Sequence, residues 1–212
     1  LSNDTIRISP LDLKSTNENK PVPQEVLDLL ETDEYQSILK FFEETVLFFE
    51  ERNATGVYKQ VRSYAEKNGV THRKKINIVN KETGDSEVRE VFDYYEHNDP
   101  KEYVIILTDH VSLLNPESGM DLRESINRFS EYMVMFRNRY NYIPVVIQQQ
   151  NTETMGLDAF KAGKVRPTIT GLGDSKYTGR DCSVMLGITN PYSHEINNYL
   201  GYDISKFKGN IR

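Results

Sequence analysis

Cysteine is nearly absent from this chain, since Cys182 is the only one among 212 residues. A single cysteine excludes an internal disulfide and any zinc site built from several cysteines, which fits a reducing cytoplasm. We expect Cys182 to lie in the core as a small hydrophobe. The chain also lacks an apolar run near the roughly 18 residues that span a bilayer, and its first ten residues lack the apolar stretch of a signal peptide. We therefore expect a cytoplasmic protein with no membrane segment.

Positive charge is also in the minority, with 26 Lys and Arg against 32 Asp and Glu and a formal net charge of -6. This balance excludes a uniformly basic nucleic-acid coat, although a local basic patch can still bind phosphates in an acidic protein. A length of 212 residues with 37% hydrophobic residues suits one sizeable α/β core and is short for two full domains. Because the chain starts at Leu1 rather than methionine, we expect a fragment of a longer protein, although processing would give the same start.

Four segments have the apolar spacing that is typical of helices. Two of them lie within 24–42. A third occupies 55–68, after the capping residue Asn53. The fourth begins at Asp121, whose spacing to Glu124 predicts a capping box, and it continues with apolar residues at intervals of four and three.

Strands are predicted where short apolar runs stand between these helices. The clearest run is 103–108, and another begins at Pro144, directly after the fourth helix. This order of strand, helix and strand predicts a parallel pair, and the wholly apolar run predicts helices on both of its faces. Further apolar runs at 46–49 and 182–188 predict two more strands, and 75–95 predicts a hairpin around a glycine turn.

Polar side chains follow two of the predicted strands, at the edge where ligands bind to open α/β sheets. Asp109 follows the strand 103–108, and its carboxylate could hold Mg2+ against nucleotide phosphates, directly or through water. It could equally cap the turn that follows. Gln149 follows the next strand, and its amide could sense a γ-phosphate or orient a water; it could also be the polar start of a loop.

The order and spacing of these features resemble the core of DnaB-type replicative DNA helicases. The residues that carry the resemblance are, in order, Asp109, Gln149, Asn151, Arg166-Pro167, Leu172 to Ser175 and Asp181. The resemblance covers most of 100–190, and it implies that 1–212 is a partial RecA-like P-loop NTPase core. In such a core a parallel sheet is flanked by helices, and the hairpin 75–95 is an insertion with no counterpart in the family.

The resemblance also implies an activity for the parent protein. Members of the family bind ATP and Mg2+, form a homo-hexameric ring and move along single-stranded DNA to unwind duplex. Asp109 is similar to the Walker B aspartate, at the nucleotide and Mg2+, and Gln149 is similar to the glutamine that senses the γ-phosphate, so both are predicted catalytic residues. A primase or helicase loader is an implied partner, in the cytoplasm of a bacterium or of a phage's host.

The segment 150–180 is the DNA-binding region that the resemblance implies. Its composition agrees, because five basic residues lie between Ala159 and Arg180 and the only acid among them is Asp174. Such a cluster can track phosphates without reading bases, although a merely soluble loop would have the same composition. The predicted DNA contacts are Lys161, Lys164, Arg166, Gly173, Asp174, Ser175, Lys176 and Arg180. Gly173 stands where the family usually has arginine and Lys176 where it usually has glycine.

The sequence departs from the family because the phosphate-binding loop G-x-x-x-x-G-K-[ST] is absent from all 212 residues. By the family's order, this loop, the catalytic glutamate and the arginine finger lie outside the chain, so we expect these residues alone to show no ATPase activity. A recombinase or packaging ATPase with a RecA-like core is an alternative function. A non-catalytic DNA-binding or interaction module that has lost the P-loop is another.

Overall fold

The computed structural model describes residues 9, 13–14, 21–79, 84–150, 167–172, 175–188, 198–199 and 202–203. The chain divides into two compact units, Leu1–Glu50 and Glu51–Arg212. The single domain expected over 1–212 stays a prediction. Across the described parts of the chain, no helix is both long and apolar enough to cross a membrane.

The two helices predicted within 24–42 are confirmed as α2 (Gln24–Leu30) and α3 (Asp33–Thr45), both in the first unit. Thr32 separates them and caps α3, because its hydroxyl accepts a hydrogen bond from the Tyr35 amide at 3.4 Å. The strand predicted at 46–49 is wrong, since these residues belong to no helix or strand and Phe48 is 89% exposed. An apolar run becomes a strand only when a neighbouring strand pairs with its backbone groups.

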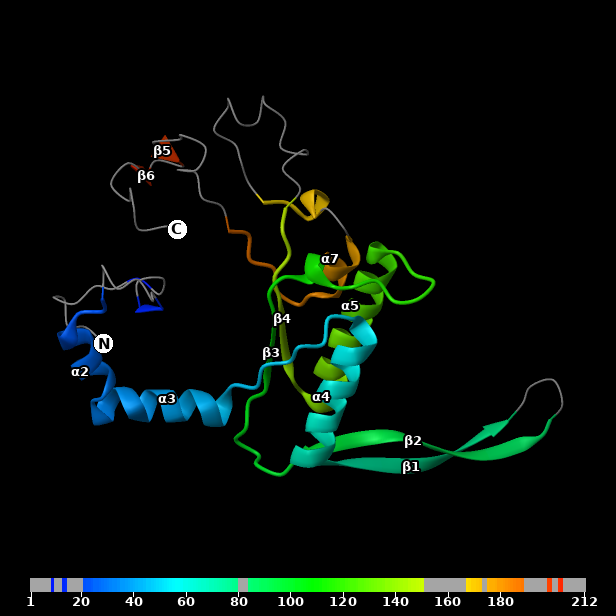
Figure 1. Ribbon diagram of the computed structural model, residues 1–212. Helices are drawn as coiled ribbons and strands as arrows, with labels where there is room; N and C mark the ends of the chain where they lie inside the picture. Colours follow the sequence, from blue (N-terminus) through cyan, green and yellow to red (C-terminus); the bar gives the residue numbers. More distant parts are fainter. Residues whose placement is uncertain are drawn as a thin grey trace. The chain divides into compact units, whose positions relative to one another are not determined.

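The second unit is a mixed α/β structure, in agreement with the coarse fold class that the sequence predicts (Figure 1). Its main elements are α4 (Ala54–Asn68), β1 (Gly69–Val79), β2 (Ser86–His97), β3 (Ile105–Thr108), the 3-10 turn η1 (Val111–Leu113), α5 (Leu122–Tyr140) and β4 (Ile143–Val146). The short elements η3 (Ile169–Gly171), α7 (Tyr177–Asp181), β5 (Asn198–Tyr199) and β6 (Tyr202–Asp203) follow. Its described strands form three pairs: β1 with β2 and β5 with β6 are antiparallel, and β3 with β4 is parallel.

The main core lies between α4, α5 and the inner face of the β3–β4 pair. Ile106 of β3 is buried there, and Phe129 and Phe136 of α5 have no exposed surface. The predicted capping box fixes the start of α5: the Glu124 amide donates to Asp121 at 2.7 Å, and the Asp121 amide donates to Glu124 at 3.0 Å. The predicted strand, helix and strand unit is therefore present and parallel.

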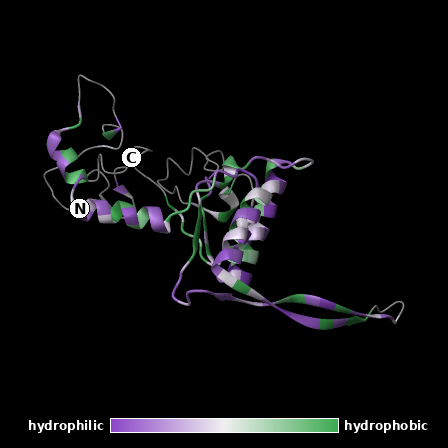
Figure 2. Cartoon of the chain, turned by 60° about the horizontal axis from the view of Figure 1, so that its bottom comes forward, coloured by the Kyte–Doolittle hydropathy of each residue, from purple (hydrophilic) through white to green (hydrophobic). Residues whose placement is uncertain are grey.

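Within the second unit, no described element covers the outer face of the β3–β4 pair. Ile105 and Leu107 alternate with the buried Ile106 and are 63% and 65% exposed, so the prediction that helices cover both faces is wrong for the described residues. Hydropathy shows the strand pair as an apolar layer beside the more polar helices (Figure 2). A wholly apolar run looks the same in the sequence whether helices cover one face of the strand or both. The run therefore cannot predict how many faces are covered.

The strand predicted at 182–188 is also wrong, because these residues belong to no helix or strand. Cys182, which was expected in the core, is exposed. Its thiol donates a hydrogen bond to the Gly179 carbonyl at 3.3 Å, at the end of α7. The apolar side chains of this segment do not pack into a core: Leu186 and Ile188 are 83% and 90% exposed.

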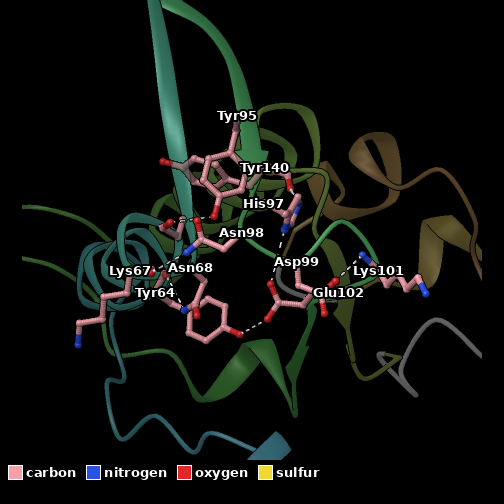
Figure 3. Close-up of polar contacts among 11 residues, drawn as sticks. Tyr64, Lys67, Asn68, Tyr95, His97, Asn98, Asp99, Lys101, Glu102 and Tyr140 are labelled. Atoms are coloured by element: carbon pink, nitrogen blue, oxygen red, sulfur yellow. Dashed lines mark hydrogen bonds and ion pairs between the residues drawn. The ribbon is translucent and has the colours of Figure 1, made fainter.

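The predicted hairpin is confirmed and is longer than 75–95, since its strands run from Gly69 to His97 and begin directly at the end of α4. The ribbon extends away from the two helices (Figure 1). Its base is fixed: the Tyr95 hydroxyl donates to the Ala65 carbonyl at 2.8 Å, and His97 Nε2 lies 2.9 Å from the Tyr140 carbonyl (Figure 3). Tyr95 passes so close to Gly69 that a side chain at position 69 would collide with its ring.

Candidate nucleotide and DNA site at the ends of β3 and β4

The two predicted catalytic residues follow neighbouring parallel strands. Thr108 of β3 lies opposite Val146 of β4, and the Ile147 amide donates to the Thr108 carbonyl at 2.9 Å. The Val111 amide returns a bond of 3.0 Å to the Ile147 carbonyl. Asp109 therefore leaves β3 beside the residues that lead from β4 to Gln149. Both side chains are exposed, and the Asp109-His110 peptide bond is cis.

The glutamines on either side of Gln149 hold the following segment of the chain. Gln148 Nε2 donates to the Ser175 carbonyl at 3.2 Å, and the Thr178 hydroxyl donates to Gln148 Oε1. Gln150 forms a two-way contact with the backbone of Thr168: its amide nitrogen donates to the Thr168 carbonyl, and the Thr168 amide donates to its oxygen at 3.1 Å. The three successive glutamines thus differ in role, since the outer two bind the protein and Gln149 presents an exposed side chain.

The polar contacts of Ser175 attach α7 to α5. Ser175 is only 1% exposed, and its hydroxyl donates to Asn127 Oδ1 at 2.6 Å while accepting from the Tyr177 amide at 3.1 Å. At the other end of α7, Asp181 accepts from the Ser130 hydroxyl at 2.5 Å, and its carbonyl accepts from Arg137 at 2.8 Å. Two separate points therefore fix this short helix to α5.

The predicted DNA-binding residues are only partly within the described chain. Lys161, Lys164, Arg166, Gly173 and Asp174 lie outside the described residues. Among the others, Ser175 has its hydroxyl directed into the protein, whereas the side chains of Lys176 and Arg180 are exposed at the two ends of α7. The guanidinium of Arg180 lies 5.4 Å from the centre of the Tyr177 ring. This cation–π contact gives Arg180 a preferred position without removing it from solvent.

An ion pair supports the loop between β3 and α5. Arg128 donates to Glu117 at 2.7 Å, and the Thr55 amide at the start of α4 donates to the other oxygen of the same carboxylate at 2.6 Å. The hydrogen bond from Thr55, with that from Arg128, lowers the pKa of Glu117 below its usual value. Arg128 is thus a structural residue, and Arg123 on the same helix is exposed.

Metal binding at this site would depend on Asp109. The described residues contain no group of three or more His, Cys, Asp or Glu side chains that could hold a metal ion. Mg2+ that arrives with nucleotide phosphates keeps several waters and needs only one or two protein carboxylates. The single carboxylate of Asp109 therefore suits a nucleotide-borne Mg2+ and would be a poor site for an ion without the nucleotide.

The residues that hold this site together could not be recognised from the sequence. Asn127, Ser130 and Arg137 lie on the face of α5 that carries α7, and Gln148 is the link from β4. A polar residue on an amphipathic helix is normally solvated, so its type and spacing gave no signal. The triple glutamine is evident in the sequence, but its division into two structural residues and one exposed residue depends on contacts with residues 18 to 30 positions away.

Comparisons with protein-family models, with curated proteins and with solved structures found no match for this chain. Its function is therefore inferred from the residues and contacts of the chain itself.

Proposed function

We propose that this chain is part of an ATP-driven DNA helicase motor with a RecA-like core, which acts as a homo-hexameric ring on single-stranded DNA. One observation carries the proposal: Asp109 and Gln149 follow adjacent parallel strands, and both side chains are exposed at the same sheet edge. Ligands of open α/β sheets bind at this edge, beyond the carboxyl ends of the strands.

The two residues have different roles in the proposed motor. Asp109 binds through its carboxylate the Mg2+ that accompanies the nucleotide, directly or through water. Gln149 contacts the terminal phosphate or the attacking water with its amide, which can donate and accept hydrogen bonds. ATP with Mg2+ supplies the free energy for movement. Because the 212 residues contain no phosphate-binding loop, the nucleotide requires further residues for its triphosphate.

The DNA-binding part of the proposal depends on α7. The exposed side chains of Lys176 and Arg180 can bind phosphates, and Gln148 connects the start of α7 to the end of β4. Gln149 is the next residue along the chain. A change in the contact between Gln149 and a nucleotide would therefore act on the backbone that holds α7.

The test is hydrolysis of ATP by the complete protein that contains these residues, with and without single-stranded DNA. We expect Asp109→Asn to lower the rate by about 100-fold or more, since it removes the charge that holds the metal. We expect Gln149→Ala to remove most of the stimulation by DNA while DNA binding is retained. The matched controls Glu131→Gln on α5 and Gln60→Ala on α4 change exposed side chains away from this edge and should leave the rates unchanged.

The outcomes separate the proposed motor from the alternatives. Wild-type hydrolysis by the Asp109→Asn variant would contradict the role of Asp109 and with it the proposal. Salt-sensitive binding of single-stranded DNA by a complete protein that hydrolyses no ATP would instead identify a non-catalytic binding module. Hydrolysis that depends on Asp109 but produces no unwinding of a forked duplex would identify another RecA-like ATPase.

A further inference from the structure

The two strands of the projecting hairpin carry opposite charge. β1 contains Arg73, Lys74 and Lys75 and no acid, so its formal charge is +3. β2 contains four acids, Glu87, Glu90, Asp93 and Glu96, against the single Arg89, so its formal charge is -3. The ribbon is therefore electrically asymmetric across its width although its net charge is zero.

The opposite charges are also in register along the ribbon. Lys75 lies directly opposite Glu90. Nearer the base, Lys74 Nζ lies 2.9 Å from Asp93, and His72 Nε2 lies 3.1 Å from Glu96. The acids of β2 also border its outer edge. A second strand with the basic residues of β1, paired with that outer edge in the same register, would place its basic residues beside the same row of acids. Among the described strands, β1 carries such a row of basic residues, so the matching strand would be β1 of another copy.

Both outer edges of the ribbon are available for pairing. Within the described residues, β1 and β2 pair only with each other, so each has a row of backbone N–H and C=O groups on its outer side. The charged side chains keep much of their surface, with Lys74 and Glu96 58% and 66% exposed. Near the far end, Val79 and Val88 are 58% and 62% exposed and could be buried by a neighbouring ribbon.

The ribbon is held at its base in a way that suits an arm for contact with another molecule. Tyr95 and His97, at the end of β2, lie near Tyr140 (Figure 3), and Tyr142 completes this aromatic cluster. The rest of the ribbon extends beyond the helices (Figure 1). Arg139 of α5 adds a cation–π contact with Phe92 at 5.4 Å. These contacts fix the direction of the arm without using its outer edges.

We propose that the hairpin is a self-association arm, in which β1 of one copy pairs antiparallel with the outer edge of β2 of a second copy, in the register found within the hairpin. Lysine on an edge strand normally prevents such pairing, because its charge would be unpaired. Here each lysine of β1 meets an acid of the neighbouring β2, so the charge favours the contact. The contact joins two different surfaces, and repeated contacts of this kind produce a ring or an open chain. The arm does not depend on the proposed motor function, since it requires neither nucleotide nor DNA.

Cross-linking between copies tests the register. In a Cys182→Ser background, Lys75→Cys and Glu90→Cys are made in separate samples of the protein, mixed and treated with a short bis-maleimide. We expect a cross-linked dimer in the mixture and none in either sample alone, because position 75 lies opposite position 90 of the neighbour and not opposite its own equivalent. No cross-link in the mixture, or equal cross-linking in the separate samples, would overturn the proposal.

Charge reversal tests the cause of the association. Lys74→Glu with Lys75→Glu makes both strands acidic, and Glu90→Lys with Asp93→Lys removes the main acids of β2. Each double variant alone should associate at least tenfold more weakly in sedimentation experiments at low salt, and an equal mixture should recover association. The variant with all four changes keeps the pairs within its own hairpin and should associate like the wild type, which separates loss of pairing from loss of folding. Unchanged association of both double variants would contradict the proposal.

Discussion

The hydroxyl of Tyr64 donates a 2.6 Å hydrogen bond to Oε1 of Glu102, and this bond joins the end of α4 to the loop that leads into β3 (Figure 3). Burial of the ring, together with the neighbouring carboxylate, raises the pKa of Tyr64 from 10.0 to about 12. The other carboxylate oxygen of Glu102 lies 3.6 Å from His97 Nδ1, at the base of the hairpin. Glu102 thus connects a helix, the hairpin and the strand that leads to Asp109.

Tyr64→Phe should lower the free energy of unfolding by about 1 kcal/mol at pH 8, because it removes one hydrogen bond to a charged acceptor. The destabilisation caused by this variant should become smaller at alkaline pH. The folded-state pKa is the higher one, so the stabilisation is complete below pH 10 and is lost as the pH rises through about 12. Urea unfolding at pH 8 and pH 11 measures this, with Tyr103→Phe, at a position 82% exposed, as the control. An equal difference between wild type and variant at both pH values would contradict the assignment.

Glu117→Gln should destabilise the protein by about 1 kcal/mol at neutral pH, since it weakens the bonds from Thr55 and Arg128. The pKa of Glu117 is lowered by folding, so its contribution is complete above the unfolded value of 4.5 and is lost as the pH falls through the folded value. The midpoint temperatures of thermal unfolding of wild type and variant should therefore converge as the pH falls. Glu131→Gln, at an exposed position, serves as the control. A difference in thermal stability between wild type and Glu117→Gln that persists at the lowest pH where the protein is folded would contradict the role given to Glu117.

Gln148→Ala should loosen the attachment of α7, because it removes the hydrogen bonds to Ser175 and Thr178. Hydrogen exchange of the Arg180 and Cys182 amides, which close the turns of α7, should become about fivefold faster, equivalent to about 1 kcal/mol. Exchange in the middle of α5 should stay unchanged. If the α7 amides exchange equally slowly in wild type and variant, the contacts with Asn127, Ser130 and Arg137 are sufficient to hold α7. That result would contradict the role given to Gln148.

The sequence predicted the helices well because their signals are local. The cap at Asn53, the capping box of Asp121 with Glu124 and the apolar spacing of α5 all act within a few residues, and each is present. Strands were predicted less well. The runs at 46–49 and 182–188 are as apolar as β3 and β4, but a strand also needs a partner edge, which the run itself does not specify.

The candidate site also combines features that are local in the sequence with features that depend on contacts between distant residues. The sequence by itself determined which chemical groups follow the strands, Asp109 after β3 and Gln149 after β4, because strand ends can be read from apolar runs. The order of strand, helix and strand also predicted that the two strands are parallel, as they are. Only the tertiary structure decided that Gln148 and Gln150 are bound to the segment 168–178 and that the hydroxyl of Ser175 is buried. Hydrogen bonds of this kind join residues far apart in the chain, and they depend on side-chain positions that packing of the whole core determines.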